Sequence, residues 1–187
     1  LRKLGIGESV NKSGYKAYLL GKFNLNRSTF DGLSKSISYF EDALKFGGEF
    51  ARTYTGLADA YTLMSLSGNS TIPMSESVAK AKENVLKALG MDESLGEAHA
   101  SLAYINFKLE WNFDEAEKEF EKAIELSPGC SKAHEWYAEY LMIHGNFGDA
   151  LESMEKAYEL DPLSVSVNFG IGKIYFYDDD LEDAVFW

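Results

Sequence analysis

The chain has 187 residues, of which 45% are hydrophobic and 26% charged, and it carries a net charge of −12 with only three prolines. This composition supports a folded core and argues against a disordered chain. The negative charge argues against direct binding of nucleic acids, because phosphates repel an acidic surface, and no apolar run reaches the length of about 18 residues that spans a membrane.

Cysteine content bears on the compartment. Cys130 is the only cysteine of the sequence, so there is neither a disulfide within the chain nor a cysteine-based zinc site. This usage is typical of a reducing compartment, and we expect a cytoplasmic protein without a membrane segment. Since the first residue is Leu1 and not Met, we also expect a piece of a longer protein.

The N-terminal segment differs from the rest in charge. Residues 1–47 contain eight basic and four acidic side chains, a net charge of +4, which leaves −16 for the remainder. The acidity is typical of a well-solvated helix surface, and head-to-tail contact between copies is the alternative interpretation of the asymmetry. The run Gly5-Ile6-Gly7 does not continue as a phosphate-binding loop. We therefore predict that residues 1–12 are a linker or the end of a preceding segment.

Helical patterns begin after this linker. The run Tyr39–Leu44 lies in a first predicted unit at about 13–47, and the run Gly56–Tyr61 lies in a second at about 48–93. Between the two predicted helices of the second unit, residues 65–74 (SLSGNSTIPM) are rich in Gly, Ser, Thr and Pro. This composition predicts an inserted loop.

The rest of the sequence repeats itself. The phrase EKAIELSP at 121–128 returns as EKAYELDP at 155–162, so that the two prolines are 34 residues apart. Upstream of these phrases the offset is 35, which indicates one extra residue near 108–111, where we predict a longer turn. A period of this size predicts stacked two-helix units. The remaining units are predicted at about 94–128, 129–162 and 163–187, the last one truncated.

Local signals support two helices per unit. Asn112 and Asn146 precede the second helices, where their side chains can cap free N–H groups, and Pro128 and Pro162 follow them, where proline prevents continuation. Small alanines allow the paired helices to approach closely, while large side chains such as Phe120 fill the space between layers.

The spacing resembles the tetratricopeptide repeat family, whose signature is a 34-residue helix–turn–helix unit. The resemblance covers about residues 15–187. It implies an all-α, right-handed superhelical solenoid of antiparallel helix pairs, with the first helix of each pair lining a concave surface. The positions that carry it are Ala116, Phe120, Ala123 and Pro128, and again Ala150, Met154, Ala157 and Pro162.

Two further phrases, Gly56–Tyr61 and Glu97–Ala103, resemble the tetratricopeptide segments of prokaryotic signalling proteins and transcription regulators. In such proteins the repeats follow other modules, for example winged-helix domains.

The alignment of units predicts which side chains face the concave groove. Members of the family can grip a C-terminal carboxylate with Lys, Asn and Arg side chains, and this chain lacks that set at the matching positions. The acidic groove positions would repel a carboxylate, so we predict an apolar or basic partner segment and not an acidic tail. For Trp136, Tyr104 and Phe169 the alternative is packing between helices. The predicted partner-binding residues are Arg52, Thr55, Asp59, Glu97, Ser101, Tyr104, Lys132, Glu135, Trp136, Glu139, Phe169 and Lys173.

Other candidate sites have simpler explanations. His99 and His134 occupy equivalent positions in successive units, about 10 Å apart, which is too far for one metal ion. Asp178–Asp180 lie at an expected turn, where solvation and helix capping explain them. The acidic stretch 114–125 alternates with lysines and predicts exposed ion pairs along a helix. We predict no catalytic residue, no metal and no cofactor.

The sequence therefore predicts a non-catalytic protein–protein interaction scaffold. The alternative is a regulatory or sensor segment of a larger signalling protein or transcription regulator, which binds an effector or mediates self-association; an ancillary segment of an enzyme is a third possibility. The last residues, 185–187, are apolar. Because a solenoid needs polar caps, we expect an exposed apolar edge there and end-to-end self-association.

Overall fold

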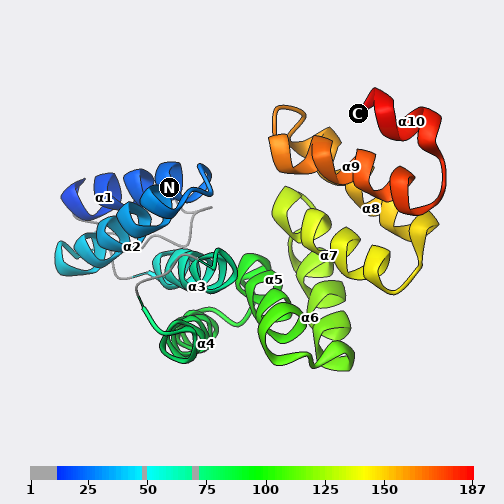
Figure 1. The fold of residues 1–187 in the computed structure, drawn as a ribbon. Coiled ribbons are helices and arrows are strands. Elements are labelled where there is room, and N and C mark those ends of the chain that lie inside the picture. Colours follow the sequence, from blue (N-terminus) through cyan, green and yellow to red (C-terminus); the bar gives the residue numbers. More distant parts are fainter. Residues whose placement is uncertain (1–11, 48–49, 69–71) are drawn as a thin grey trace.

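The computed structural model describes residues 12–47, 50–68 and 72–187, where all regular secondary structure is helical and no strand occurs. The helices follow one another as pairs in a curved array, with the N-terminal and C-terminal pairs at its two ends (Figure 1). The pairs are α1 (Lys12–Leu25) with α2 (Phe30–Lys45), α3 (Ala51–Leu66) with α4 (Met74–Met91), α5 (Gly96–Ile105) with α6 (Phe113–Leu126), α7 (Ser131–Ile143) with α8 (Phe147–Leu160), and α9 (Val165–Tyr177) with α10 (Leu181–Phe186).

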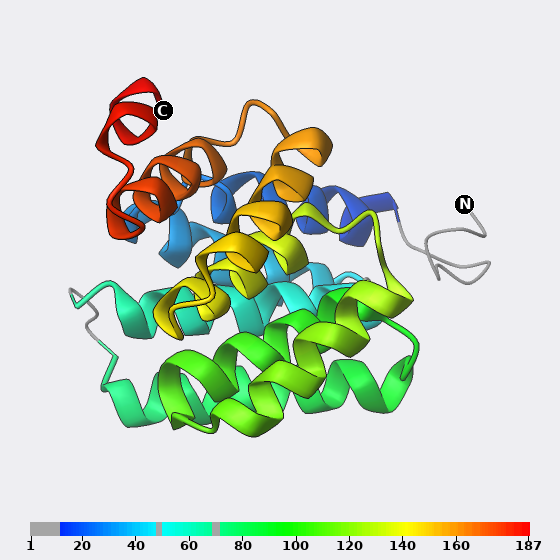
Figure 2. The same ribbon diagram turned by 90° about the vertical axis from the view of Figure 1, so that its right-hand side faces the viewer.

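The array confirms the predicted all-α solenoid. Figure 2 shows the α7–α8 pair between the α5–α6 pair and the α9–α10 pair, as expected when each pair packs on its neighbours. The exact unit boundaries stay a prediction. No helix within the described ranges is both long enough and apolar enough to cross a lipid bilayer.

The core fills the space between successive pairs. One cluster of buried apolar side chains extends from α1 to α5 and a second from α5 to α9, so α5 belongs to both. Phe40 is completely buried, and its ring packs against Gly21 of α1 and Gly56 of α3, where any Cβ atom would overlap the ring. Phe120 fills the same role in the second cluster, as predicted. These large rings set the distance between layers.

The predicted helix ends are correct in position but not in every contact. Helices α6 and α8 end two residues before Pro128 and Pro162. Asn112 and Asn146 stand at the N-cap positions of α6 and α8, yet neither side chain makes a capping hydrogen bond, so that prediction was wrong. By contrast, the Thr29 hydroxyl does cap α2 and accepts a hydrogen bond from the N–H of Gly32.

We predicted that the extra residue of the third unit lengthens the turn. Instead, it widens the helix. Residues Asn106–Glu110 continue α5 as a π-helical turn, called η2, and Trp111 ends it in the left-handed conformation with φ of 57°. Gly145 and Asp179, one and two units later, are left-handed at the same position. The turn therefore has the same shape in these units, and the additional residue is absorbed before it.

The predicted loop at 65–74 is shorter than expected. Helix α3 continues through Leu66 and α4 begins at Met74, so the connection covers 67–73, of which 69–71 lie outside the described residues. Residues 1–11, with the Gly5-Ile6-Gly7 run, lie outside them as well.

Helix α10 carries exposed apolar side chains. Val185 and Phe186 are 87% and 81% exposed, whereas Trp187 packs edge-on against Tyr158 with ring centroids 5.2 Å apart.

Candidate functional site

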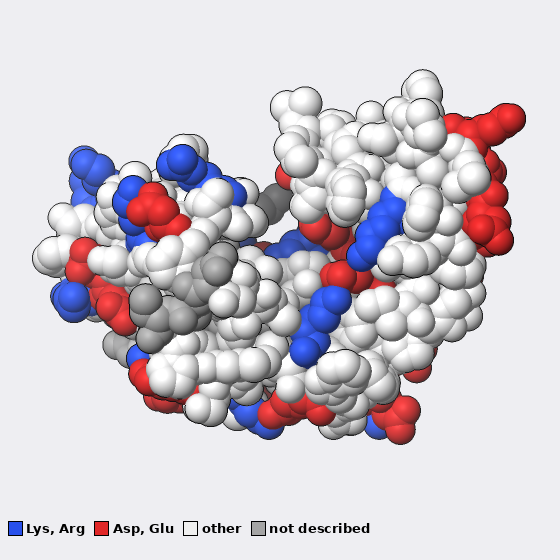
Figure 3. Space-filling view, viewed as in Figure 1, with Lys and Arg blue, Asp and Glu red and all other residues white. Residues whose placement is uncertain are grey.

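The first helices of the pairs meet at the bottom of a hollow. Figure 3 shows the molecule hollowed between its two ends, with basic and acidic atoms on the floor and along one wall. Helix α5 packs against both α3 and α7, so these three first helices form a continuous layer. Most of the predicted groove residues belong to this layer.

Asp59 of α3 is the centre of a polar network on this floor. Its side chain is only 5% exposed, and it accepts a hydrogen bond of 2.6 Å from the Ser101 hydroxyl of α5 and forms an ion pair with Lys132 of α7. The Lys132 ammonium also lies 4.7 Å from the centre of the Trp136 ring. Although burial alone would lower it, the Asp59 carboxylate raises the pKa of Lys132. A buried carboxylate is thus neutralised by a cation two units away in sequence.

A second ion pair lies beside the first. Arg52 of α3 lies 3.0 Å from Glu97 of α5, and the Glu97 carbonyl accepts a 2.9 Å hydrogen bond from Ser101. The other carboxylate oxygen of Glu97 is buried without a hydrogen-bond partner within the described residues. Lys22 of α1 lies close to the same cluster. Burial and the neighbouring Lys132 ammonium lower the pKa of Lys22.

The third part of the network joins η2 to α7. Glu139 accepts a 3.0 Å hydrogen bond from the Tyr104 hydroxyl and a 2.6 Å ion pair from Lys108 of η2. Burial and the nearby Glu139 carboxylate raise the pKa of Tyr104 well above its usual range. The Tyr104 ring stacks on Trp136 with centroids 4.1 Å apart and planes 11° apart. Both rings are buried, as the packing alternative predicted.

The wall towards the C-terminus is more accessible. Phe169 of α9 is 70% exposed and Lys173 is half-buried. Burial, reinforced by the neighbouring Glu139, raises the pKa of Glu135, although the Ser166 hydroxyl that hydrogen bonds to it acts in the opposite direction. Within the described part of the chain, Glu135 makes no ion pair.

Burial divides the predicted groove residues into two layers. One layer is inaccessible and holds the floor together, and the other can reach a partner. Sequence reasoning missed Lys22 and Lys108. Lys108 lies in the π-helical turn that accommodates the extra residue of the third unit, and that extra residue was the sequence signal for it. The inner layer consists of Thr55, Asp59, Ser101, Tyr104 and Trp136, and the outer layer of Arg52, Glu97, Lys132, Glu135, Glu139, Phe169 and Lys173.

The histidines have a structural role, as predicted. His99 and His134 are buried, and each Nε2 lies within 3.0 Å of the carbonyl oxygen six residues earlier, that of Glu93 and of Pro128 respectively. Asn168 donates to the Pro162 carbonyl from the same position of the next unit. This contact holds the end of one unit to the start of the following one. No group of three potential metal-binding side chains occurs among the residues that the structure describes.

The acidic turn and the acidic helix are also structural. The Asp180 carboxylate accepts from the N–H of Asp183 and caps α10, as predicted for this aspartate run. On α6 the predicted ion pairing occurs once, between Lys118 and Glu115 at 3.3 Å.

The geometry defines a helical-repeat solenoid, and known proteins of one repeat family are similar to it. Residues 112–165 match the family model described as tetratricopeptide repeat. The chain is also similar in fold to a thermophilic tetratricopeptide protein of Thermus thermophilus, with a TM-score of 0.69, 15% identity, and coverage of 88% of this chain and 82% of that one. The predicted resemblance is therefore confirmed, in sequence over residues 112–165 and in fold over most of the chain.

Two further proteins are similar to this chain. The chain is 26% identical over 170 residues to the transcriptional regulator HilA of Salmonella typhimurium strain LT2, which covers 90% of this chain but only 30% of the regulator's length. YrrB, described as a TPR protein with an unusual peptide-binding site, has a TM-score of 0.51 and 22% identity over 95% of this chain and 82% of its own. The latter likeness shows the fold alone.

Proposed function

We propose that this chain is a non-catalytic scaffold that binds a peptide or a partner segment in its concave hollow. Tetratricopeptide proteins act generally through protein–protein interaction, and the peptide-binding site reported for YrrB supports the same use of this fold. The observation that carries the proposal is the network around Asp59, which ties α3, α5 and α7 into one layer. A floor that is cross-linked in this way loses little conformational freedom on binding.

The charges of the floor are largely neutralised within the chain. Arg52, Lys108 and Lys132 are paired with Glu97, Glu139 and Asp59 respectively, so these cations are not free to grip an incoming carboxylate. Besides the half-buried Lys173, the outer layer offers the carboxylate of Glu135 and the exposed ring of Phe169. These groups favour an apolar or basic segment over an acidic C-terminal tail, and an amphipathic basic helix is the partner that we propose.

Peptide titration tests this proposal. A fluorescent amphipathic peptide with basic residues on one face should bind the whole chain, and we expect Phe169→Ala to weaken binding by about tenfold, as for a central apolar contact of an interface. Phe186→Ala is the matched control, because Phe186 is equally exposed but lies on α10. If the control weakens binding as much, or if an acidic tail peptide binds with micromolar affinity, the proposed groove is wrong.

A second candidate function follows from the similarity to HilA. We propose as an alternative that the chain is a regulatory segment of a larger transcription regulator, which binds an effector or mediates self-association. Light scattering across protein concentration would detect self-association through the exposed edge at Val185 and Phe186. In the complete protein, deletion of this segment should change reporter transcription; unchanged transcription would exclude the alternative.

Neither proposal involves catalysis, a cofactor, a membrane or direct contact with nucleic acid. The lone Cys130 supports a reducing compartment such as the cytoplasm, and that localisation stays a prediction.

A further inference from the structure

One face of α9 is open towards the hollow. The buried face of this helix carries Val167, Ile171 and Ile174, and four residues at steps of three, four and three positions share another face. The Glu135 carboxylate of α7 accepts a hydrogen bond from the first of the four, the Ser166 hydroxyl, and this contact turns their face to the hollow. We call this face the α9 stripe; it consists of Ser166, Phe169, Lys173 and Phe176.

Two large rings of the α9 stripe are exposed to water. Phe169 and Phe176 both face solvent, and Phe176 is 57% exposed, whereas Met142 at the equivalent position of α7 is only 6% exposed. A single exposed apolar side chain is normal on a folded protein, but neighbouring ones on the wall of a hollow are typical of a surface that binds another molecule.

The α9 stripe also holds a cation without a counter-ion. Lys173 is half-buried and makes no ion pair within the described ranges. The equivalent residue of α7, Glu139, has two partners, the Tyr104 hydroxyl and the Lys108 ammonium. Because Glu135 also lacks an ion pair in this part of the chain, the wall carries one unmatched charge of each sign.

We propose that the α9 stripe binds a helical segment of a partner protein that carries, besides its basic residues, one acidic residue opposite Lys173. This inference rests on the proposed function, since it concerns the partner segment of the same hollow. Ser166, which meets Glu135, lies seven residues before Lys173, about 10 Å along the helix. The partner's basic and acidic residues should therefore lie two turns apart, with an apolar residue between them opposite Phe169.

Other segments fit the wall less well. An all-basic segment would place a cation against the Lys173 ammonium, and an all-acidic one would place a carboxylate against Glu135; both contacts are repulsive. An extended segment presents every second side chain, which does not match a stripe that repeats at steps of three and four residues, whereas two helices packed at a small angle share this repeat.

Three labelled, capped helical peptides, titrated with the whole chain in fluorescence anisotropy, test the inference. The first peptide has a central Glu, a Lys seven residues before and after it, and Leu three or four residues from it, so it meets both charges in either direction. The second has Lys in place of the central Glu, and in the third the Glu is exchanged with the residue two positions on, away from the contact face. The first should bind about fivefold more tightly than the others, the value of one favourable charge contact.

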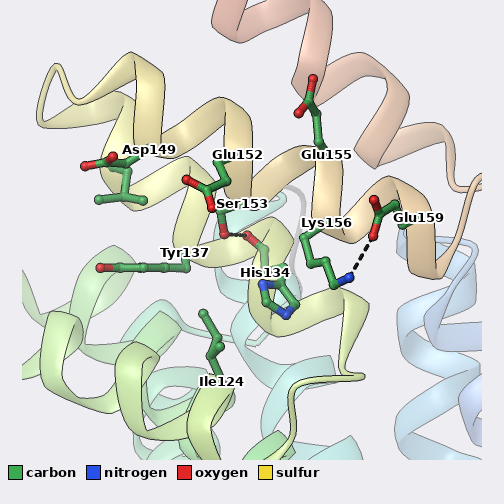
Figure 4. A pocket seen from close by; sticks show the side chains of 10 residues that line it. Ile124, His134, Tyr137, Asp149, Glu152, Ser153, Glu155, Lys156 and Glu159 are labelled. Carbon is green, nitrogen blue, oxygen red and sulfur yellow. Dashed lines mark hydrogen bonds and ion pairs between the residues drawn. The ribbon is translucent and has the colours of Figure 1, made fainter.

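Variants assign this preference to Lys173. Lys173→Gln should reduce it to less than twofold, and Lys173→Glu should reverse it, so that the all-basic peptide binds more tightly. Lys156→Glu is the matched control, because it makes the same change of charge on the second helix α8, where Lys156 lies 2.7 Å from Glu159 (Figure 4); the preference should persist. Phe176→Ala should weaken all three peptides by about fivefold, as for an apolar contact of an interface.

The outcomes separate this inference from the proposed function. If none of the peptides binds, the proposed function fails and the inference fails with it. If all three bind equally, or if the preference persists in Lys173→Gln, the α9 stripe does not select an acidic residue, and only the inference is overturned. Loss of the preference in Lys156→Glu would overturn it as well, because net charge would then explain the difference.

Discussion

The ion pair between Asp59 and Lys132 joins helices that are not sequential neighbours in the solenoid. Its partners are 73 residues apart, and Ser101 of the intervening α5 donates to the same carboxylate. In a repeat protein each unit usually contacts only the next one, so a side-chain link that skips a unit adds coupling along the array. Asp59→Asn should therefore lower both the stability and the cooperativity of unfolding.

The magnitude follows from burial. Removal of one partner of a buried ion pair costs about 3–5 kcal/mol, because the other charge stays buried and uncompensated. The Lys132 side chain, however, is 29% exposed, and water can partly solvate the ammonium that Asp59→Asn leaves behind. We therefore expect a loss of about 2–3 kcal/mol. Lys132→Met should cost more, since Asp59 is only 5% exposed and would keep just the Ser101 hydrogen bond.

Urea unfolding followed by circular dichroism measures these losses. The double variant should lose at least about 1 kcal/mol less than the sum of the single variants, because it leaves no uncompensated charge. Lys35→Met is the matched control: it breaks an exposed pair with Asp31 and should cost less than about 0.5 kcal/mol. If the two network substitutions are additive, or if Asp59→Asn costs no more than the control, the reasoning about a buried link is refuted.

The direction of the pH dependence follows from the raised pKa of Lys132. A folded state that raises the pKa of a lysine binds its proton more tightly than the unfolded chain does. The stabilisation by the pair is therefore complete at neutral pH. It is lost as the pH rises beyond the ordinary lysine value of about 10.4 and through the higher folded value.

Four other substitutions test separate parts of the structure. In urea unfolding, Gly56→Ala should destabilise the folded chain by about 1–3 kcal/mol, because the new Cβ would overlap the Phe40 ring. Gly90→Ala, which lies in open space on α4, should stabilise the folded chain by about 0.5–1 kcal/mol. Trp111→Gly should raise the melting temperature, since a left-handed conformation costs roughly 1 kcal/mol for any residue with a Cβ; a lower melting temperature would contradict this. Burial raises the pKa of Glu135, so stability should fall as the pH rises above about 4.5, and Glu135→Gln should flatten that slope.

The repeat made most of the fold predictable. A 34-residue period specifies one kind of contact many times, so alanines, large core rings and terminal prolines had to lie where the alignment placed them. Phe120 and the histidine positions are examples, because each follows from its place in the unit. The sequence also showed that the third unit has one extra residue, but it did not show which structure accommodates that residue. An extra residue can be absorbed by a loop or by a wider helical turn, and only packing around Asn106–Glu110 decides between them.

The site was less predictable because its contacts are not periodic. The alignment shows which side chains share a face but not which of them pair across units, and the link from Asp59 to Lys132 has no counterpart in the repeat. For the same reason an acidic groove was expected from Asp59, Glu135 and Glu139, whereas two of these three carboxylates are neutralised within the chain.

This pairing changes where specificity should reside. Charged groups that are already satisfied within the fold give a partner little to gain, since their contacts would have to be broken before new ones form. Within the described ranges, the groups that still offer binding energy are the Glu135 carboxylate, which makes no ion pair, the exposed Phe169 ring and the half-buried Lys173. The Glu135 carboxylate favours a basic group of the partner, and the Phe169 ring favours an apolar one. We therefore expect the hollow to select a basic and partly apolar segment by charge, with the Phe169 contact fixing its position.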